Sequence, residues 1–389
     1  MFTFDEIAQY KKGPFGSALK KDLFVPQSEN AIKVYEQQNA IKKDWTLSRY
    51  YITKDYFNAH MKQFVAKAGD LIVSCAGTIG EVYELPKDAE EGVFNQALMR
   101  VRVNNEVVNK EIFITVFSSM IDKFSKIYSN GSAIKNIPPF ADLKKTQVYL
   151  PCKEEQIVIA QLLRSLDERI ATQNKIIDKL QSLIKGLNDS LYAQYGGKVL
   201  TSFAELGTSY SGLSGKSAQD FGSGKPFITY LNVYSNNVIN ENEFQYVAIK
   251  DDEKQNVAEY GDVLFTLSSE TPREVGIGSV YLGKEKVYLN SFCFGIHITN
   301  MEVAFPPYLS YYVSSTAFRK FIYPYAQGST RFNLCKADFE KASIKLPTLE
   351  NQKRIYSILS HIDNKIITER QMLDLYNSQK QYLLRQMFI

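Results

Sequence analysis

The chain has 389 residues, of which 44% are hydrophobic and 23% charged, and its formal net charge at pH 7 is +4, so we expect about two to three domains with real cores. No apolar run reaches the roughly 18 residues of a membrane span, and the N-terminus carries acids where a secretion signal carries Lys or Arg; we therefore expect a soluble, cytoplasmic protein with no membrane contact. The four cysteines and three histidines are scattered without a Cys-x-x-Cys pair, which indicates neither a disulfide framework nor a metal site.

The first element in chain order is a basic loop over residues 11–21, interrupted by glycines and containing four lysines. Further basic residues follow over residues 42–54, interleaved with one tryptophan and several tyrosines. Basic loops that also carry Tyr, Asn, Gln and Ser suit a protein that positions DNA phosphates and reads base edges. A solvated surface loop explains the same residues equally well on physical grounds alone.

Each half of the chain is expected to be a strand-rich α/β domain. A Gly-Asp turn, Gly69-Asp70 in one half and Gly261-Asp262 in the other, leads into an apolar strand. The later elements also occur in pairs, as strands at 98–103 and 292–298, helices at 111–127 and 307–322, and strands at 145–150 and 342–346. The chain segments that precede the two turns align poorly.

Two long segments of the chain repeat one another without a gap, at a constant offset of 196 residues (346 − 150). Both begin with Leu-Pro followed by acids, which suits a helix start, and Gly196-Gly197 ends the first one. Twelve positions are identical: Leu150/Leu346, Pro151/Pro347, Glu154/Glu350, Gln156/Gln352, Ile159/Ile355, Leu163/Leu359, Asp167/Asp363, Ile170/Ile366, Thr172/Thr368, Asp178/Asp374, Ser182/Ser378 and Leu187/Leu383. A repeat with two copies predicts a tandem of two half-molecules, each a globular part followed by a long helix.

Each long segment carries an apolar seam that steps by alternating fours and threes, as in a coiled coil. We predict two continuous antiparallel helices of roughly 60 Å, since each residue adds about 1.5 Å. The seam includes Leu163, Leu166, Ile170, Ile177 and Leu180 in the first helix and Leu359, Ile362, Ile366 and Leu373 in the second. Gln173 and Glu369 are equivalent polar positions, which we expect to be offset after reversal of one helix, although a shared polar layer is the alternative near the midpoint.

The order of these motifs, present twice, resembles that of type I restriction-modification specificity subunits over essentially the whole chain. The segments that carry the resemblance are residues 12–17, 33–41 and 69–80, Asn95-Gln96-Ala97-Leu98, Gly131-Ser132, Lys135-Asn136-Ile137, and the Leu-Pro-x-x-Glu-x-Gln helix starts. The second half departs from this pattern over residues 267–273, which read Leu-Ser-Ser-Glu-Thr-Pro-Arg where the first half has Ser-Cys-Ala-Gly-Thr-Ile-Gly over residues 74–80.

The resemblance implies two target-recognition domains, each reading one half of a split DNA sequence, with the helices setting the spacing. The corresponding boundaries are 1–151 for the first recognition domain, 152–195 for the central helix, 196–347 for the second recognition domain and 348–389 for the C-terminal helix. The implied partners are double-stranded DNA, two modification (methyltransferase) subunits that use S-adenosylmethionine, and restriction subunits that need ATP and Mg. No cofactor is expected in this chain.

Candidate DNA-contacting residues are loop side chains that donate to phosphates or pair with base edges. For the first domain they are Lys12, Ser17, Lys20, Lys21, Gln37, Gln38, Asn39, Thr78 and Lys135. For the second domain they are Lys216, Ser217, Tyr230, Asn232, Arg273, Ser329 and Arg331.

Catalysis by this chain itself is not predicted. Residues 215–217 do not form a P-loop, because that motif requires glycine where Tyr210 stands, and no Ser-His-Asp or paired-carboxylate pattern is present. Two alternatives are kept: a two-module adaptor that binds protein without DNA specificity, and a solitary methyltransferase or nuclease. Absence of salt-dependent DNA retention with the purified partner would favour the adaptor. Methyl transfer by the isolated chain would favour the solitary enzyme.

Overall fold

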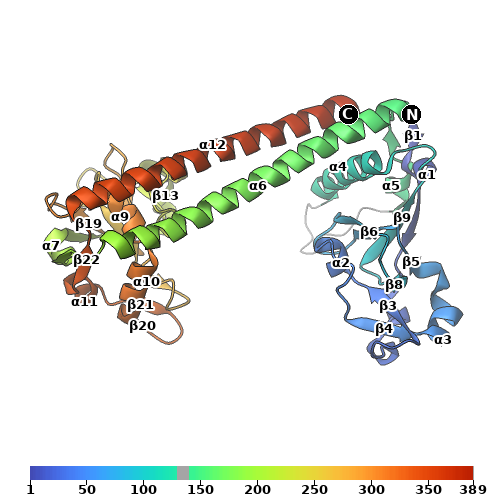
Figure 1. The fold of residues 1–389 in the computed structure, drawn as a ribbon, viewed down its shortest axis with the longest axis horizontal. Helices are drawn as coiled ribbons and strands as arrows, with labels where there is room; N and C mark the ends of the chain where they lie inside the picture. The colour runs from blue at the N-terminus through green and yellow to red at the C-terminus, as the bar shows by residue number, and fades with distance from the viewer. Residues whose placement is uncertain (129–139, 389) are drawn as a thin grey trace. The chain divides into compact units, whose positions relative to one another are not determined.

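The computed structural model describes residues 1–128 and 140–388, and the chain forms two compact units (Figure 1). Unit 1 comprises Met1–Ala171 with Asp374–Ile389, and unit 2 comprises Thr172–Leu373. The division falls inside both long helices rather than at their ends. Each helix therefore belongs partly to one unit and partly to the other.

Unit 1 contains two four-stranded sheets. The first has the order β2 (Ala8–Lys12), β9 (Leu98–Val103), β6 (Leu71–Ser74), β7 (Val82–Glu84), and the second β4 (Tyr50–Thr53), β3 (Ala31–Tyr35), β8 (Gly92–Phe94), β5 (Val65–Ala66). Within these sheets β3 and β8 are parallel, and the other pairings are antiparallel. Helix α4 (Lys110–Tyr128) buries Phe113 and Phe117 against the first sheet, in one core with Leu71 and Val101.

Unit 2 repeats this arrangement. Its four-stranded sheet has the order β12 (Gly207–Ser211), β19 (Cys293–Ile298), β15 (Val263–Thr266), β17 (Gly278–Val280), and its second sheet the order β14 (Gln245–Val247), β13 (Phe221–Ile228), β18 (Tyr288–Leu289). The parallel β13–β18 pair corresponds to β3–β8. A further sheet joins β16 (Ser268–Ser269), β21 (Phe332–Leu334) and β20 (Ala326–Gln327).

The first and last strands of each half of the chain pair with one another in both units. The terminal strands pair as β1 (Phe2–Thr3) with β10 (Gln147–Val148) and as β11 (Val199–Thr201) with β22 (Ile344–Leu346). The remaining α-helices are α1 (Phe4–Ile7), α2 (Gln37–Ile41), α3 (Lys54–Tyr56), α5 (Phe140–Lys145), α7 (Phe203–Leu206), α8 (Tyr230–Ser235), α9 (Pro306–Tyr312), α10 (Thr316–Ile322) and α11 (Lys336–Lys341). The single helix expected over residues 307–322 is divided, because Ser315 lies in an extended conformation and its side chain caps α10 by accepting from the Phe318 N–H.

The aspartate of each Gly-Asp turn is buried at the start of its strand and accepts from the backbone N–H three residues earlier, at 3.0 Å in one unit and 2.9 Å in the other. Its second partner differs between the units. Asp70 binds Arg102 Nε at 2.6 Å, whereas Asp262 lies 2.9 Å from His297 Nδ1. Both partners come from the adjacent strand, β9 or β19, so each turn that the sequence indicates is anchored to the same neighbouring strand by a different side chain.

The predicted long helices are present and continuous, as α6 (Lys153–Tyr195) and α12 (Leu349–Phe388). The positions of the expected seam, which recur at alternating steps of four and three residues, are all buried or half-buried. The positions that flank them are mostly exposed. The seam residues that the sequence indicates, Leu163, Leu166, Ile170, Ile177, Leu180, Leu359, Ile362, Ile366 and Leu373, all follow this pattern.

The two helices run antiparallel within each unit. In unit 2, the end of α6 around Leu187 and Leu191 shares a core with Ile355 and Leu359 at the start of α12. In unit 1, Leu163 near the start of α6 shares a core with Leu384 near the end of α12.

The expected offset between Gln173 and Glu369 is wrong. Gln173 Nε2 donates to the Glu369 backbone oxygen at 3.0 Å and also to its carboxylate, and both side chains are buried. These positions lie at the midpoint of the repeat, where reversing one helix brings equivalent residues face to face. The alternative of a shared polar layer is the one that the structure shows.

The start of each long helix carries a glutamine that is identical in the two repeats, and this glutamine anchors the helix to its globular part. Gln156 accepts from the Asn109 N–H at 2.7 Å and donates to the Val107 oxygen at 3.2 Å. Gln352 makes the equivalent pair of bonds, to the Phe305 N–H and the Val303 oxygen, each at 2.8 Å. Both glutamines are buried, so these bonds satisfy polar groups that would otherwise be costly.

A search of the described helices for a stretch with the length and apolar character of a membrane span finds none.

Candidate nucleic-acid interface

The loop after the first long strand of each domain is held against a turn by a glycine. Gly13 donates its N–H to the Leu98 oxygen at 2.9 Å, and a Cβ atom there would lie 1.9 Å from the Asn95 oxygen. Gly212 occupies the equivalent place, where a Cβ atom would lie 2.1 Å from the Asn290 oxygen. Only glycine permits this approach, so both loops start from the same fixed point.

A short helix in each domain is tied to the loop after the Gly-Asp strand. Gln37, the first residue of α2, donates through Nε2 to the Ala76 oxygen and, at 3.3 Å, to the Thr78 oxygen. Tyr230, the first residue of α8, donates its hydroxyl to the Ser268 oxygen at 2.8 Å. Ala76 and Ser268 both lie two residues beyond the end of the strand, β6 or β15, so the two contacts are equivalent.

Two of the expected reading residues are internal supports instead. Asn39 is 2% exposed, and its amide donates to the Asp44 and Leu47 oxygens at 2.9 and 2.8 Å. Asn232, at the same helix position, is fully buried and bonds the Asn240 oxygen at 2.8 Å and its N–H at 3.0 Å. Because these bonds already use the amide groups, neither side chain is available to a base edge in this conformation.

The loop after β2, helix α2 and the loop after β6 lie together at one edge of the first domain. Besides the Gln37 contact, the Cys75 N–H donates to the Ala97 oxygen at 2.8 Å. Burial raises the pKa of the Cys75 thiol to about 12, and the charge of Lys12 opposes that rise. Four expected contact residues are exposed on these segments: Lys12, Ser17, Gln38 and Thr78.

Three further lysines were expected to contact DNA from the first domain. Lys20 and Lys21 are exposed, at the start of a short helical turn that ends at Leu23. Lys135 lies outside the described residues.

Two expected contacts of the second domain are occupied within the domain. The Lys216 side chain is 7% exposed, forms an ion pair with Glu253 and donates to the Ala248 oxygen at 2.7 Å. Hydrogen bonds from Lys216 and then Gln255 hold the pKa of Glu253 at about 2. Ser217 is exposed, but its hydroxyl binds Asp220 at 2.8 Å, closing a cap. Lys216 is therefore neutralised internally rather than presented to phosphate.

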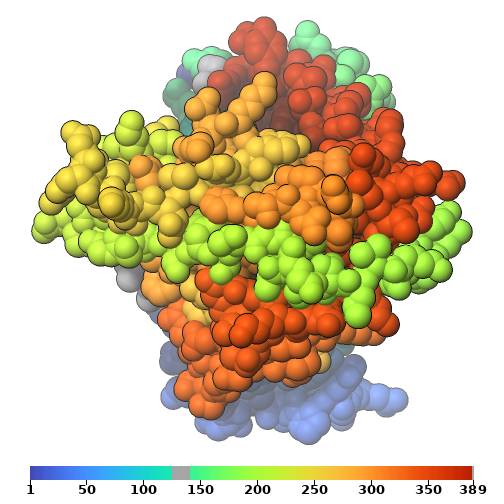
Figure 2. All heavy atoms as spheres, turned by 90° about the vertical axis from the view of Figure 1, so that its left-hand side faces the viewer, coloured from blue at the N-terminus to red at the C-terminus, as the bar shows by residue number. Residues whose placement is uncertain are grey.

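Three further expected contacts of the second domain are exposed. Arg273 and Arg331 are exposed, and so is Ser329. The Arg331 guanidinium lies 5.9 Å from the ring centre of Phe292, whose side chain is 56% exposed. Phe292 did not stand out in the sequence, because it reads as the first residue of an apolar strand. Figure 2 shows one face of unit 2, with the yellow-green to yellow segment that contains β13 and β14 at the left-hand edge of the view.

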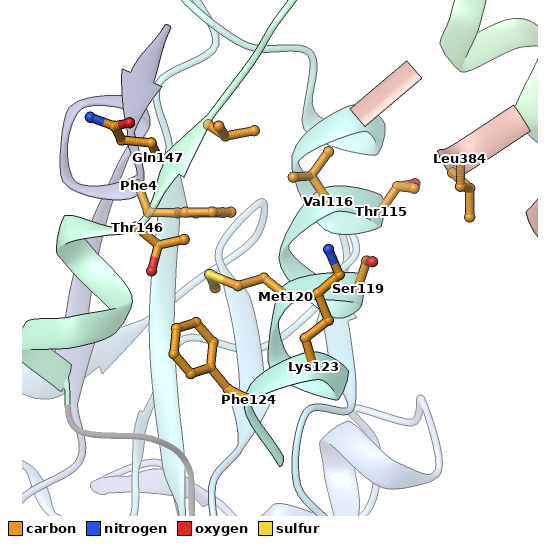
Figure 3. Close-up of a pocket in the computed structure, with 11 residues that line it drawn as sticks. Phe4, Thr115, Val116, Ser119, Met120, Lys123, Phe124, Thr146, Gln147 and Leu384 are labelled. Atoms are coloured by element: carbon orange, nitrogen blue, oxygen red, sulfur yellow. The ribbon is translucent and has the colours of Figure 1, made fainter. Parts of the chain in front are cut away.

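A cavity of about 220 Å³ opens in unit 1 between α4, β10 and the end of α12 (Figure 3). Apolar side chains such as Phe4, Met120 and Leu384 line most of it, with hydroxyl groups from Thr115 and Ser119. Lys123 is the ionisable residue of this lining. The described residues of the chain contain no group of three or more His, Cys, Asp or Glu side chains placed to hold a metal ion.

The sequence model of one family, described as the type I restriction modification DNA specificity domain, matches residues 1–182 and 208–375. Two solved structures share the fold over nearly the whole length. One is the S subunit of a type I restriction-modification system from M. genitalium, with 14% identity, a TM-score of 0.52 and coverage of 100% of this chain and 95% of that one. The other comes from a study of the assembly and conformational transition of the type I R-M system, with 15% identity, a TM-score of 0.59 and coverage of 99% and 98%. With the family matched in both halves, this chain belongs to the type I restriction-modification DNA specificity family.

Proposed function

We propose that each globular half of this specificity subunit reads one part of a two-part DNA sequence. The observation that carries the proposal is the repeated edge, in which a glycine-anchored loop, a short helix and a second loop are tied together by equivalent contacts. The framework is the same twice, but the exposed side chains on it differ. Two different reading sets on one chain make the target bipartite and asymmetric.

The exposed residues divide by chemistry. Lysines without a planar group, such as Lys12, Lys20 and Lys21, suit phosphates and contribute an affinity that depends on salt but not on sequence. Gln38 and Thr78 carry groups that pair with base edges in the major groove, each good bidentate pair discriminating by about 1–3 kcal/mol. Arg273 and Arg331 are the corresponding candidates in the second domain, since Arg pairs bidentately with guanine.

The chain itself is proposed to be non-catalytic. The modification subunits would supply adenine methylation with S-adenosylmethionine, and the restriction subunits cleavage with ATP and Mg, acting on DNA in the cytoplasm. The tandem repeat supports this arrangement, because two equivalent surfaces let two copies of one modification subunit bind one specificity chain. The family to which the chain belongs is one of DNA specificity, which favours this function over a protein-binding adaptor.

The test is methylation profiling of a host that carries the whole system, with and without this chain. We expect one bipartite motif to be methylated only when the chain is present. A methylated motif that persists without the chain would contradict the proposal. So would purified complex that shows no salt-dependent retention on DNA, the result that an adaptor predicts.

A further inference from the structure

Helix α8 of the second domain presents a residue at the position that Gln38 occupies in the first. The equivalence follows from the strands before the helices: the Tyr35 oxygen accepts from the Asn95 N–H at 3.0 Å, and the Ile228 oxygen accepts from the Asn290 N–H at 3.0 Å. Three residues beyond Tyr35 is Gln38, and three residues beyond Ile228 is Leu231.

The neighbours of Leu231 determine where it points. Tyr230 before it is held by its hydroxyl bond to Ser268, and Asn232 after it is buried and bonded to Asn240. With both neighbours tied inward, the leucine is left outward, and 68% of it is exposed. In the first domain Gln37 and Asn39 are tied inward by equivalent bonds, and Gln38 between them is exposed.

The strand pair that anchors Tyr230 also carries a cation next to an aromatic ring. Tyr230 donates to the Ser268 oxygen, and β16, which contains Ser268, pairs with β21, which begins directly after Arg331. Burial raises the pKa of the Tyr230 hydroxyl, and the charge of Arg331 opposes that rise. Arg331 in turn lies over Phe292, which is also exposed. An exposed leucine is ordinary on a protein surface. At the place of a reading glutamine, on a helix anchored to the strand pair that follows Arg331, it has the setting of a base contact.

We propose that Leu231 is a specificity-determining residue of the second half-site and contacts the 5-methyl group of a thymine in the major groove. Thymine is the base that presents a methyl group there, and apolar side chains are its usual partners. Glutamine at the same position of the first domain suits an adenine edge instead. The inference rests on the proposed function, because it assigns one contact within the DNA reading that the function requires.

The experiment uses the assembled methyltransferase complex and the motif that methylation profiling defines. Each thymine of the second half-site is replaced in turn by deoxyuridine, which differs from thymidine by the methyl group alone, and duplex binding is measured. At one position we expect the wild-type complex to bind deoxyuridine about fourfold more weakly, the effect of one methyl group removed from water. Leu231→Ala should bind both duplexes alike, and Leu231→Met should keep the preference.

Leu200→Ala is the matched control, since Leu200 lies in β11 of the same unit and is 67% exposed. Leu200→Ala should retain the wild-type preference for thymidine over deoxyuridine. The specificity of the Leu231→Ala complex for the first half-site should be unchanged in methylation profiling, which reports that the chain is folded. A second half-site without thymine, or a deoxyuridine effect that is the same in wild type and Leu231→Ala, would overturn the inference while leaving the function in place. Absence of any motif that depends on the chain would instead overturn the proposed function.

Discussion

Asn39 and Gln38 are adjacent residues with opposite roles, one holding the helix and the other exposed on it. Asn39→Ala should lower the free energy of unfolding by roughly 1–3 kcal/mol for each buried group left without a partner. Gln38→Ala should change it by less than about 0.5 kcal/mol, because the side chain is exposed. Chemical denaturation measures both.

The same two variants differ in their effect on specificity. Gln38→Ala should relax the specificity at one or two bases of one half-site and leave the specificity of the other half-site unchanged. Methylation profiling measures both. A Gln38→Ala variant that alters both half-sites, or neither, would remove this residue from the reading set.

Lys20 and Lys21 carry point charges in an exposed segment, so we expect them to hold phosphates. Replacing both by Ala should weaken binding to all DNA sequences alike and make the slope of log affinity against log salt shallower by about one unit per lost contact. Titrations of the complex at several salt concentrations, on cognate and unrelated duplexes, measure this slope. A loss confined to the cognate sequence would show that these lysines read bases.

Glu253 makes the second domain sensitive to acid. Its pKa is depressed from 4.5 to about 2 by the bonds from Lys216 and Gln255, so the folded state favours the ionised carboxylate. The resulting stabilisation is complete above about pH 4.5 and is lost as the pH falls toward about 2. Glu253→Gln should therefore lower the melting temperature more at pH 7 than at pH 3. Glu302→Gln, at an exposed glutamate, controls for the loss of one charge.

At the scale of the element, the seam of the long helices can be tested with a single charge. Leu166 is 4% exposed, so Leu166→Asp buries a carboxylate without a partner and should lower the free energy of unfolding by roughly 3 kcal/mol or more. Ser165→Asp, at the exposed neighbouring position, is the control and should have little effect. Equal melting temperatures for the two variants would count against the seam.

The Gln173–Glu369 layer sets the register of these helices in unit 2. Sliding one helix by a heptad would bury each polar side chain against apolar seam residues and leave it without its partner. Buried polar pairs of this kind are best attested as devices that select one register of a coiled coil. The layer therefore favours one antiparallel alignment of the two helices.

At the scale of the whole molecule, we expect the helices to set the DNA spacer. Seven residues beyond Gln173 is Leu180, and seven before Glu369 is Ile362, so insertions directly after Leu180 and directly before Ile362 keep the polar layer paired. Three heptads at each place add roughly 31 Å of helix. This is close to one turn of DNA, about 34 Å, so the angle between the two half-sites around the DNA axis changes little.

Methylation profiling of that double insertion should show a spacer longer by about nine or ten base pairs and two unchanged half-sites. Insertion in one helix alone is the control, and it should disrupt assembly because the helices pair. A spacer that stays fixed, or half-sites that change, would show that the helices are not the ruler.

The sequence by itself was sufficient for the tandem repeat, the two continuous helices, their seam and the paired Gly-Asp turns. All of these depend on local periodicity, or on residues a few positions apart, which a linear pattern records directly. The family resemblance was likewise visible in the order of short motifs, and the family match confirms it. The candidate DNA contacts were chosen by residue type, and they remain predictions.

The tertiary structure decided which side chains are free. Asn39 and Asn232 are consumed by buried bonds, and Lys216 is neutralised by Glu253, which is 37 positions away in sequence. The match between Gln38 and Leu231 was hidden because the segments around them align poorly, yet their backbones are fixed by equivalent contacts to distant loops. Burial and pairing depend on residues brought together by folding, and composition and spacing along the chain do not record them.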